Sequence, residues 1–228
     1  VKMKVFHAIS HAVPVAATKR VTALAEEEGW DLNVITAGEF SDDNYLSNPV
    51  NRCYYCKNSL YETVAQHTTW QVFSGANLDD LGEYRPGLVA AAESAVRHPY
   101  IEFGVTKSEI RYLANDLGLP DISRLPASPC LSSRIETGLP IEGNLLLVVD
   151  NIENRIRAMI NPDIVRCRVR HSGISVEIDN NTLNKLRDSQ LVAIEEMVNE
   201  LLHKKHVSLP IRFAEYVNGS AFIGVKNV

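Results

Sequence analysis

Short apolar segments alternate with helix-like segments in the first half of the chain. Residues 4–9, "KVFHAI", are typical of a buried strand, and residues 31–36 and 70–75 predict two more. Between the first two, residues 16–29 carry apolar side chains near helical spacing and end on Gly29, which can terminate a helix. Strands that alternate with helices favour a parallel sheet covered by helices, so the first part is predicted to be an α/β domain.

A helix with clear start and stop signals follows at residues 106–117. Thr106 and Glu109 form a capping box, "TKSE", and Gly118 with Pro120 ends the helix. Residues 119–140 are then rich in Pro and Ser, which indicates either a functional loop or a linker.

The pattern changes after residue 140. A helix is expected at 143–159 and a hairpin at 164–179, with its turn near Ser172–Gly173. A long amphipathic helix is expected at 182–203 and two short strands at 210–216 and 221–226. We therefore predict an α/β domain over residues 1–140 and a smaller α+β domain over residues 141–228.

Length and charge narrow the classes of function. The 228 residues fit one large domain, or one medium domain with a smaller one. With 23 basic and 28 acidic residues the net charge is −5, so a nucleic acid is not favoured as a partner. No apolar run reaches the ~20 residues of a membrane span, and the first residues lack the features of a signal peptide. These two observations predict a cytoplasmic protein. The chain begins without Met, and we expect it to start inside a longer protein.

The four cysteines are the most informative residues for chemistry. Cys53 and Cys56 form a Cys-x-x-Cys pair, which suits a redox dithiol, half of a zinc site or part of an iron–sulfur site. Two unrelated thiols near a helix start are the plainer alternative. Cys130 stands in a loop, "ASPCLSSR", where packing requires no thiol, so it could complete a three-thiolate site with one iron left open. Cys167 alternates within a strand and is expected to be a small buried apolar residue.

Polar side chains follow the third predicted strand. Asn77, Asp79, Asp80 and Arg85 lie just after it, where open α/β sheets bind ligands. A turn that caps the next helix explains them equally well.

Three arginines, Arg166, Arg168 and Arg170, alternate along one predicted strand and share one of its faces. An anion such as phosphate would relieve their mutual repulsion, and so would a nearby acid such as Glu177. Arg97 and Arg134 would add to this basic set if the fold brought them close.

Five ordered motifs together resemble a known family. They are "NPVNRCYYCKNSLY", "GANLDDLGEYRPGLVAAAESAVRHPY", "GVTKSEIRYLANDLGLP", "ASPCLSSRI" and "RCRVR". The set resembles the ATP-dependent sacrificial sulfur transferases of the LarE type, in the PP-loop pyrophosphatase superfamily, over roughly residues 4–180.

The resemblance implies an activity. A PP-loop domain (adenine nucleotide alpha hydrolase-like) would use ATP and Mg²⁺ to adenylate a substrate carboxylate, and sulfur would then displace AMP to leave a thiocarboxylate. The family's substrate is a pyridinium biscarboxylate mononucleotide on the route to a nickel-pincer nucleotide cofactor. Some members give up a cysteine sulfur, and others carry an extra sulfide on a [4Fe-4S] cluster.

The resemblance also assigns residues. The three-cysteine pattern implies that Cys53, Cys56 and Cys130 hold the cluster, with Cys130 at the catalytic position. Arg166 and Arg168 match paired arginines expected to hold phosphate, and Glu177 falls near an acidic position. The expected substrate contacts are Asn77, Asp80, Arg85, Arg97, Ser133, Arg134, Arg166, Arg168 and Glu177.

Two stretches depart from the family pattern. The family's "SGGxDS" loop, which cradles the ATP phosphates, is absent, and we expect it to precede Val5 together with the first strand. The PP-loop domain is therefore expected to be incomplete at its N-terminus. The family also tends to end in a Gly/Arg/Ser-rich stretch, where this chain has "EYVNGSAFIGVK".

Other functions remain open at this point. A PP-loop tRNA thiolase is the close alternative, and binding of unmodified tRNA would support it. A non-catalytic cluster- or metal-binding relative is the alternative from another class, and a zinc-stabilised domain is a third. The family further implies a homo-oligomer.

Overall fold

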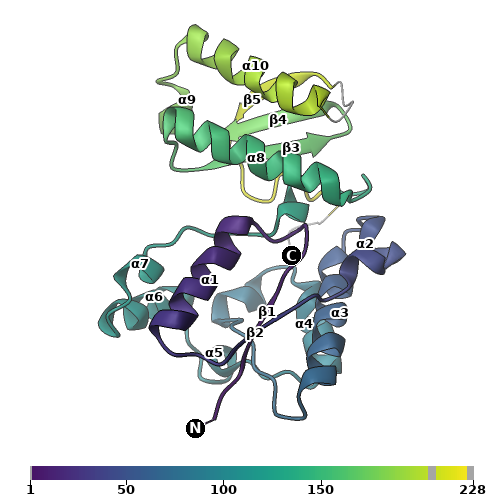
Figure 1. Cartoon of the computed structure of the whole chain (residues 1–228), viewed down its shortest axis with the longest axis vertical. Helices are drawn as coiled ribbons and strands as arrows, with labels where there is room; N and C mark the ends of the chain where they lie inside the picture. The colour runs from purple at the N-terminus through teal and green to yellow at the C-terminus, as the bar shows by residue number, and fades with distance from the viewer. Residues whose placement is uncertain (1, 205–208, 225–228) are drawn as a thin grey trace.

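The computed structural model describes residues 2–204 and 209–224 of the chain. It is a mixed α/β structure in which most ordered residues are helical. Figure 1 shows two sheets toward opposite ends of the molecule, one near the N-terminus and one under two long helices.

The first sheet is parallel and has two strands. β1 (Val5–Ala8) pairs with β2 (Leu32–Ile35), and α1 (Val15–Glu27) connects them. The strands include the β-branched residues Val5, Val34 and Ile35, and the helix is followed by Gly29, which adopts the positive φ of 64° that favours glycine. The predicted strand–helix–strand unit is confirmed here.

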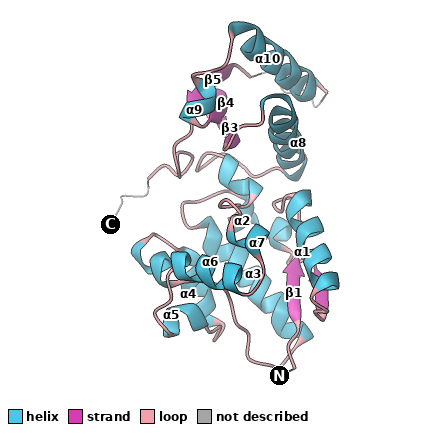
Figure 2. Ribbon diagram, turned by 90° about the vertical axis from the view of Figure 1, so that its left-hand side faces the viewer, coloured by secondary structure: helices cyan, strands magenta, loops and turns pink. Residues whose placement is uncertain are grey.

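The other regular elements between residues 2 and 140 are helices, which loops connect, as Figure 2 shows by colour. They are the short helices η1 (Glu39–Ser41), α2 (Asp43–Leu46), η2 (Leu78–Gly82), α5 (Pro99–Glu102), α7 (Pro120–Ser123) and η3 (Leu131–Arg134), and the longer helices α3 (Arg52–His67), α4 (Pro86–Glu93) and α6 (Lys107–Asp116).

The prediction of a third strand at residues 70–75 is wrong. Only Phe73 forms a β-bridge, with Arg97, and no strand develops around it. Trp70 and Phe73 are largely exposed, so no core packing supports an extended run there. The helix predicted at 106–117 is confirmed as α6, including the Thr106–Glu109 capping box.

The second sheet has three strands in the order β3-β4-β5. β3 (Val165–Arg170) and β4 (Gly173–Ile178) form the predicted antiparallel hairpin, and β5 (Ile211–Glu215) adds a parallel strand. The helix α8 (Gly143–Ile160) confirms the helix predicted at 143–159.

Two predictions in this part need correction. The single helix expected at 182–203 is two helices, α9 (Asn180–Leu183) and α10 (Asp188–His203), because Asp179 caps the first turn separately. Residues 221–224 form no strand, and Val225 and Lys226 lie outside the described residues.

The main hydrophobic core lies between α8, α10 and the second sheet. Leu146, Ile152 and Ile156 of α8 are fully buried in it, and so is Ile194 of α10. The same cluster extends to Tyr45 in the first half of the chain. The boundary proposed at residue 140 stays a prediction.

Residues 131–141 connect the two sheets. Leu131 donates its amide hydrogen to the Ala12 carbonyl, and Glu136 donates to Val169 of β3. Gly138 donates to Asn48, beside α3. The stretch at 119–140, predicted as a functional loop or a linker, therefore forms backbone hydrogen bonds with both the first and the second part of the chain. Residues 131–136 within it are all buried.

Among the described residues, no helix combines the length and the apolar character needed to cross a membrane.

Candidate functional site

Three of the four cysteines meet near this connection. Cys53 and Cys56 lie in the first two turns of α3, three residues apart, so both thiols lie on one face of the helix. Cys130 precedes η3 at its N-cap position. Cys56 and Cys130 both pack against the main core cluster, and all three thiols are only partly buried.

The three thiols are close enough to influence one another. Burial raises the pKa of Cys56 to about 12, and its electrostatic interaction with Cys130 is the next cause. Burial raises the pKa of Cys53 as well, again with Cys130 as the second cause, whereas the neighbouring Arg52 lowers it. Two distant segments of the sequence therefore carry thiols that influence one another, and the assignment of the three cysteines to a metal site stays a prediction.

Arg134 fixes the backbone of the Cys130 loop. Its Nη1 donates to the carbonyl oxygens of Pro129 and Cys130, at 2.8 and 3.1 Å. Its Nε and Nη2 donate to the two carboxylate oxygens of Glu153 on α8, at 2.9 and 3.0 Å. Ser133 adds a hydrogen bond from its hydroxyl to the Cys130 carbonyl, at 2.7 Å. The carbonyl of Cys130 is thus held by two side chains that the sequence had placed among the substrate contacts.

Glu153 is a fully buried carboxylate that several donors keep ionised. It also accepts from the Cys167 amide at 3.0 Å and from Arg157 at 2.9 Å. Burial by itself raises the pKa of such a carboxyl, but the hydrogen bond and charge of Arg134 and the Cys167 amide bring the pKa of Glu153 below its usual range. Cys167 is fully buried in the core, which confirms its predicted structural role.

Tyr45 closes the site from the side of α2. Its hydroxyl shares a 2.6 Å hydrogen bond with Ser132, and both side chains are buried. Burial, with Cys130 as the next cause, raises the pKa of the Tyr45 phenol, so the phenol is protonated at neutral pH.

The three alternating arginines do share a face, and their partners lie within the chain. Arg168 donates to Glu177 at 2.9 Å, and Arg170 donates to Glu177 at 2.6 Å and to Glu136 at 3.3 Å. Among residues 2–204 and 209–224, Arg166 finds hydrogen-bond acceptors only in the backbone carbonyls of Val165 and Ala127. The nearby acid considered as an alternative to phosphate is Glu177, which pairs with Arg168 and Arg170, and the side chains of Arg166, Arg168 and Glu177 are all buried.

The C-terminal segment, residues 216–222, covers these arginines. The Tyr216 ring lies 5.8 Å from the Arg166 guanidinium and 6.0 Å from that of Arg168. The Val217 carbonyl accepts from Arg168, and Ser220 bonds to Arg170 and Glu177. At its end the Phe222 ring lies 5.0 Å from the Arg52 guanidinium of α3.

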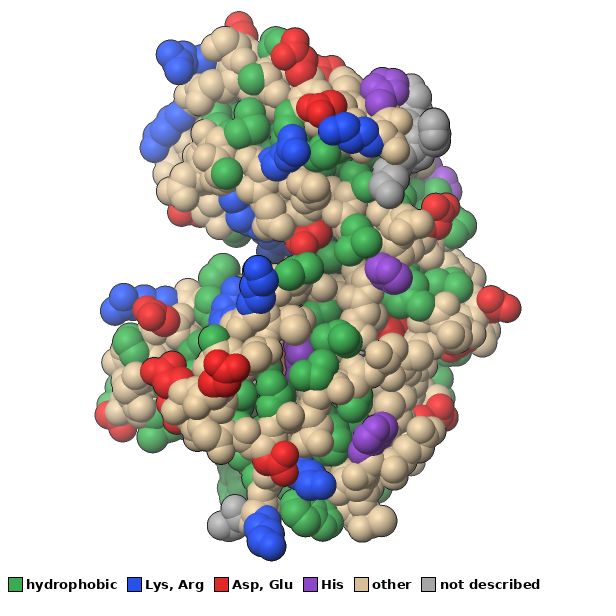
Figure 3. Space-filling view, in the orientation of Figure 1, with side chains coloured by type: hydrophobic (Ala, Val, Ile, Leu, Met, Phe, Trp, Pro, Cys, Tyr) green, Lys and Arg blue, Asp and Glu red, His purple; other side chains and the backbone are tan. Residues whose placement is uncertain are grey.

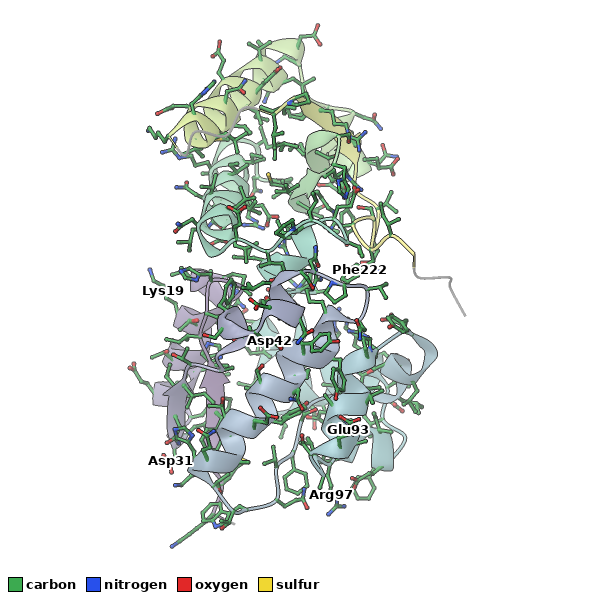
Figure 4. The ribbon with its side chains drawn as sticks, turned by 90° about the vertical axis from the view of Figure 1, so that its right-hand side faces the viewer. Lys19, Asp31, Asp42, Glu93, Arg97 and Phe222 are labelled. Atoms are coloured by element: carbon green, nitrogen blue, oxygen red, sulfur yellow. The ribbon has the colours of Figure 1, made fainter. Side chains whose placement is uncertain are left out.

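The remaining predicted contacts lie elsewhere and are paired locally. Asn77 and Asp80 form the capping box of η2, and Asp80 pairs with Arg85 at 2.9 Å. Arg97 pairs with Glu102 on the exposed surface. Figure 4 shows Arg97 at the lower end of the molecule, far from Phe222 at the centre. The structure thus brings Arg134 near Arg166, and it leaves Arg97 apart.

Four site residues were missed by the sequence analysis. They are Glu39, Asn48, Arg52 and Glu153, and all are buried at or behind the cysteine site. Asn48 and Arg52 stand inside "NPVNRCYYC", so their closeness to Cys53 was a usable signal. Glu153 lies in an amphipathic helix, and its sequence neighbours do not indicate which residue it pairs with.

Thiolates are ligands both of zinc ions and of iron–sulfur clusters, so the three cysteines can be compared with both donor sets. Among the described residues, no group of three or more His, Cys, Asp and Glu side chains is arranged to hold one metal ion. In an iron–sulfur cluster each thiolate binds a different iron, so its ligands stand further apart than those around one zinc ion. Three neighbouring, partly buried thiols on two segments fit that donor set.

One face of the molecule is hollowed. Figure 3 shows a notch between the part that holds α8 and the part that holds α6 and α7, with Lys and Arg side chains at its border. Elsewhere on this face basic and acidic side chains are interspersed.

Comparison with known proteins gives one named relative. A pyridinium-3,5-bisthiocarboxylic acid mononucleotide synthase of Lactiplantibacillus plantarum is 28% identical over 187 residues, which is 80% of this chain and 65% of that protein. The chain is similar to this synthase. No family model matches the chain.

Two uncharacterized proteins are also similar. One from a Synechocystis strain is 33% identical over 176 residues, or 72% of this chain and 65% of that protein. One from Methanocaldococcus jannaschii is 27% identical over 195 residues, or 80% of this chain and 75% of that protein. The chain thus spans just under two thirds of the length of the synthase and of the Synechocystis protein.

Proposed function

We propose that this protein is an ATP-dependent sulfur transferase of the LarE type. It adenylates a carboxylate of a pyridinium biscarboxylate mononucleotide and replaces one carboxylate oxygen by sulfur. The single observation that supports this most is the meeting of Cys53, Cys56 and Cys130 at one partly buried site. The similarity to a named synthase supports the substrate class.

Sulfur transfer to an acyl adenylate requires the protein to hold a sulfur nucleophile close to the activated carbonyl carbon. The adenylate has a good leaving group, AMP, so a sulfur nucleophile attacks the carbonyl carbon and AMP departs with the electrons of the C–O bond. The nucleophilic sulfur must be held still near this carbon, because misplacement costs rate. The carbonyl of Cys130, held by Ser133 and Arg134, gives the loop this fixed position.

The three cysteines would hold a [4Fe-4S] cluster. When bound with one iron left open, such a group supplies an external sulfide without consuming the polypeptide. The chain's own residues hold the cysteine-bearing segment in position. Arg134 and Glu153 orient the Cys130 loop, and the Tyr45–Ser132 hydrogen bond fixes the neighbouring turn.

The arginines of β3 would receive the phosphate of the nucleotide substrate. Arg166 is the strongest candidate, because its side chain is buried and, within the described part of the chain, its guanidinium donates only to backbone carbonyls. ATP and Mg²⁺ are part of the proposal, and the Asp80–Arg85 turn is the candidate contact for them on this chain.

A sulfur-insertion assay tests the proposal. The protein, purified without oxygen, is incubated with the pyridinium biscarboxylate mononucleotide, ATP and Mg²⁺, and the products are read by mass spectrometry. Wild type and Cys167→Ala should give the thiocarboxylate and AMP, since Cys167 lies in the core away from the chemistry. Cys130→Ala should give AMP without thiocarboxylate. Full sulfur insertion by Cys130→Ala, or no AMP from the wild type, would contradict the proposal.

A further inference from the structure

One short stretch, residues 45–52, links the two cysteine-bearing segments by hydrogen bonds. It leads directly into Cys53 on α3, and its partners lie in residues 131–141, which directly follow Cys130. Of the described residues from 43 to 67, three form hydrogen bonds with that segment: Tyr45, Leu46 and Asn48. The position of α3 relative to the Cys130 segment therefore depends on a small set of hydrogen bonds.

Asn48 forms most of these bonds. Its side-chain nitrogen donates to the carbonyls of Glu136 and Leu139, at 2.8 and 2.9 Å. Its own carbonyl accepts from the Gly138 amide at 2.9 Å. An Asn side chain has two N–H donors, and here both are used on backbone carbonyls of the same segment. One residue therefore holds three residues of the segment that follows Cys130.

The side-chain oxygen of Asn48 connects the same amide to α3. Arg52, the first residue of α3, donates to this oxygen through Nη1. Asn48 is 0% exposed and Arg52 is 2% exposed, so water does not compete for the hydrogen bond between them. Because Cys53 follows Arg52 on the helix, the Asn48 amide bridges the start of the cysteine helix and the segment after Cys130.

The two flanking contacts are single hydrogen bonds. The Tyr45 hydroxyl shares a 2.6 Å hydrogen bond with the Ser132 hydroxyl, and the Leu46 carbonyl accepts from the Ile141 amide at 2.8 Å. Both lie on the same two segments as the Asn48 contacts. They support the bridge, but neither reaches α3 itself as Asn48 does through Arg52.

The backbone at residue 48 limits which side chains can form this bridge. Its φ of 55° lies in the left-handed region, which Gly adopts readily and Asn adopts more often than most residues. Gly lacks the side chain, and the carboxylate of Asp cannot donate to two carbonyl oxygens. Asn combines the backbone conformation with both the donors and the acceptor that the bridge uses.

We propose that Asn48 is a positioning residue of the three-cysteine site, and that it sets the separation between Cys130 and the two thiols on α3, Cys53 and Cys56. The inference rests on the proposed function in treating these three thiols as one site. It adds a residue that acts through the two segments that carry the thiols. A fixed separation matters there, because small displacements of reacting groups cost rate.

Cross-linking of the thiols with dibromobimane tests the proposal. Each thiolate displaces one bromide, and a link forms only where a second thiol lies within the short reach of the reagent. The reduced, metal-free protein is treated, digested with trypsin and analysed by mass spectrometry. Cys53 and Cys56 lie between the cleavage sites at Arg52 and Lys57, so their mutual link stays within one peptide. A link from either of them to Cys130 joins two peptides.

The measured ratio is the yield of links to Cys130 divided by the yield of the link between Cys53 and Cys56. The second link is the internal control, because α3 alone fixes the spacing of these two thiols. In wild type the links to Cys130 should form. In Asn48→Asp and Asn48→Gly the ratio should fall by about tenfold, because buried hydrogen bonds are worth a factor of this order.

Val198→Ala is the matched control for a general loss of stability. Val198 is fully buried in α10, and its replacement leaves every hydrogen bond of Asn48 in place. Circular dichroism establishes that each variant is folded under the conditions of the reaction. Val198→Ala should lower the free energy of unfolding and leave the cross-linking ratio unchanged.

An unchanged ratio in folded Asn48→Asp or Asn48→Gly would overturn the proposal. An equal fall in Val198→Ala would overturn it as well, because the effect would then follow from lost stability alone. Absence of links to Cys130 in folded wild type would overturn it even if both Asn48 variants failed to fold. The assay needs no ATP, metal or sulfur acceptor, so its failure is distinct from failure of the sulfur-insertion assay.

Discussion

Arg134 ties the Cys130 loop to helix α8 by donating two hydrogen bonds, of 2.9 and 3.0 Å, to the carboxylate of Glu153. Both side chains are almost fully buried. The same guanidinium holds the carbonyls of Pro129 and Cys130, so one ion pair sets the position of Cys130 relative to the core.

Replacing Glu153 by Gln should destabilise the protein strongly. Breaking one partner of a buried ion pair leaves the other charge uncompensated and costs about 3–5 kcal/mol. Urea unfolding would measure the loss. Glu200→Gln is the control, because Glu200 forms an exposed pair with Lys204 and should leave the unfolding midpoint unchanged. Equal effects of the two changes would contradict the role given to Glu153.

The same carboxylate should make stability depend on pH in the acid range. The pKa of Glu153 in the folded state lies below its usual value, so its contribution is fully present above about pH 4.3, the ordinary Glu pKa. The contribution is lost as the pH falls through the lower, folded pKa.

The wild-type advantage over Glu153→Gln in unfolding free energy should therefore shrink from pH 6 toward pH 3. Urea titrations at several pH values would measure it. An advantage that stayed constant over this range would show that Glu153 does not titrate with unfolding.

Asn48 should tolerate glycine better than alanine. Its φ of 55° lies in the left-handed region, and its side chain donates to Glu136 and Leu139 while fully buried. Asn48→Gly loses the hydrogen bonds, about 1–3 kcal/mol, and Asn48→Ala adds about 1 kcal/mol or more of backbone strain.

Thermal unfolding of both variants would measure this order. Asn161 is the matched control, since it has a φ of 44° at the exposed end of α8. Asn161→Gly should be close to neutral, because it gives up no buried hydrogen bond. If Asn48→Ala were no worse than Asn48→Gly, the strain at residue 48 would be refuted.

Ser220 should hold the C-terminal segment on the arginines of β3. Its hydroxyl donates to Glu177 at 2.8 Å and accepts from Arg170 at 2.9 Å. Ser220→Ala should loosen the segment, so the Thr137 amide, which donates to Ala221, should exchange its hydrogen faster. Ser172→Ala, on the exposed turn of the hairpin, is the control. Unchanged exchange at Thr137 would mean that Ser220 is dispensable for this contact.

Much of the fold could be read from local patterns. The capping box at Thr106, the alternation around Cys167 and the apolar spacing of α8 are signals carried by neighbouring residues, and the elements they predict are present. The strand predicted at 70–75 failed because its apolar residues are not packed, and packing is a tertiary property.

For the same reason, only part of the candidate site could be predicted from the sequence. The three cysteines could be grouped by their residue type, but the partners of the arginines could not be read from spacing. Arg168 was expected to meet phosphate, and the structure pairs it with Glu177, which lies diagonally across from it on the neighbouring strand β4. Glu153 and Arg134 are 19 residues apart in sequence, and only the fold brings them into contact.

The metal content of the protein tests the three-cysteine site most directly. The protein would be purified without oxygen, and iron, acid-labile sulfide and zinc would be counted per chain in wild type, Cys130→Ala and Cys167→Ala. About four irons with matching sulfide are expected in wild type and in Cys167→Ala, with loss or impairment in Cys130→Ala. Zinc in place of iron, no metal after reconstitution, or a cluster unaffected by Cys130→Ala would contradict the assignment of Cys53, Cys56 and Cys130 to one cluster.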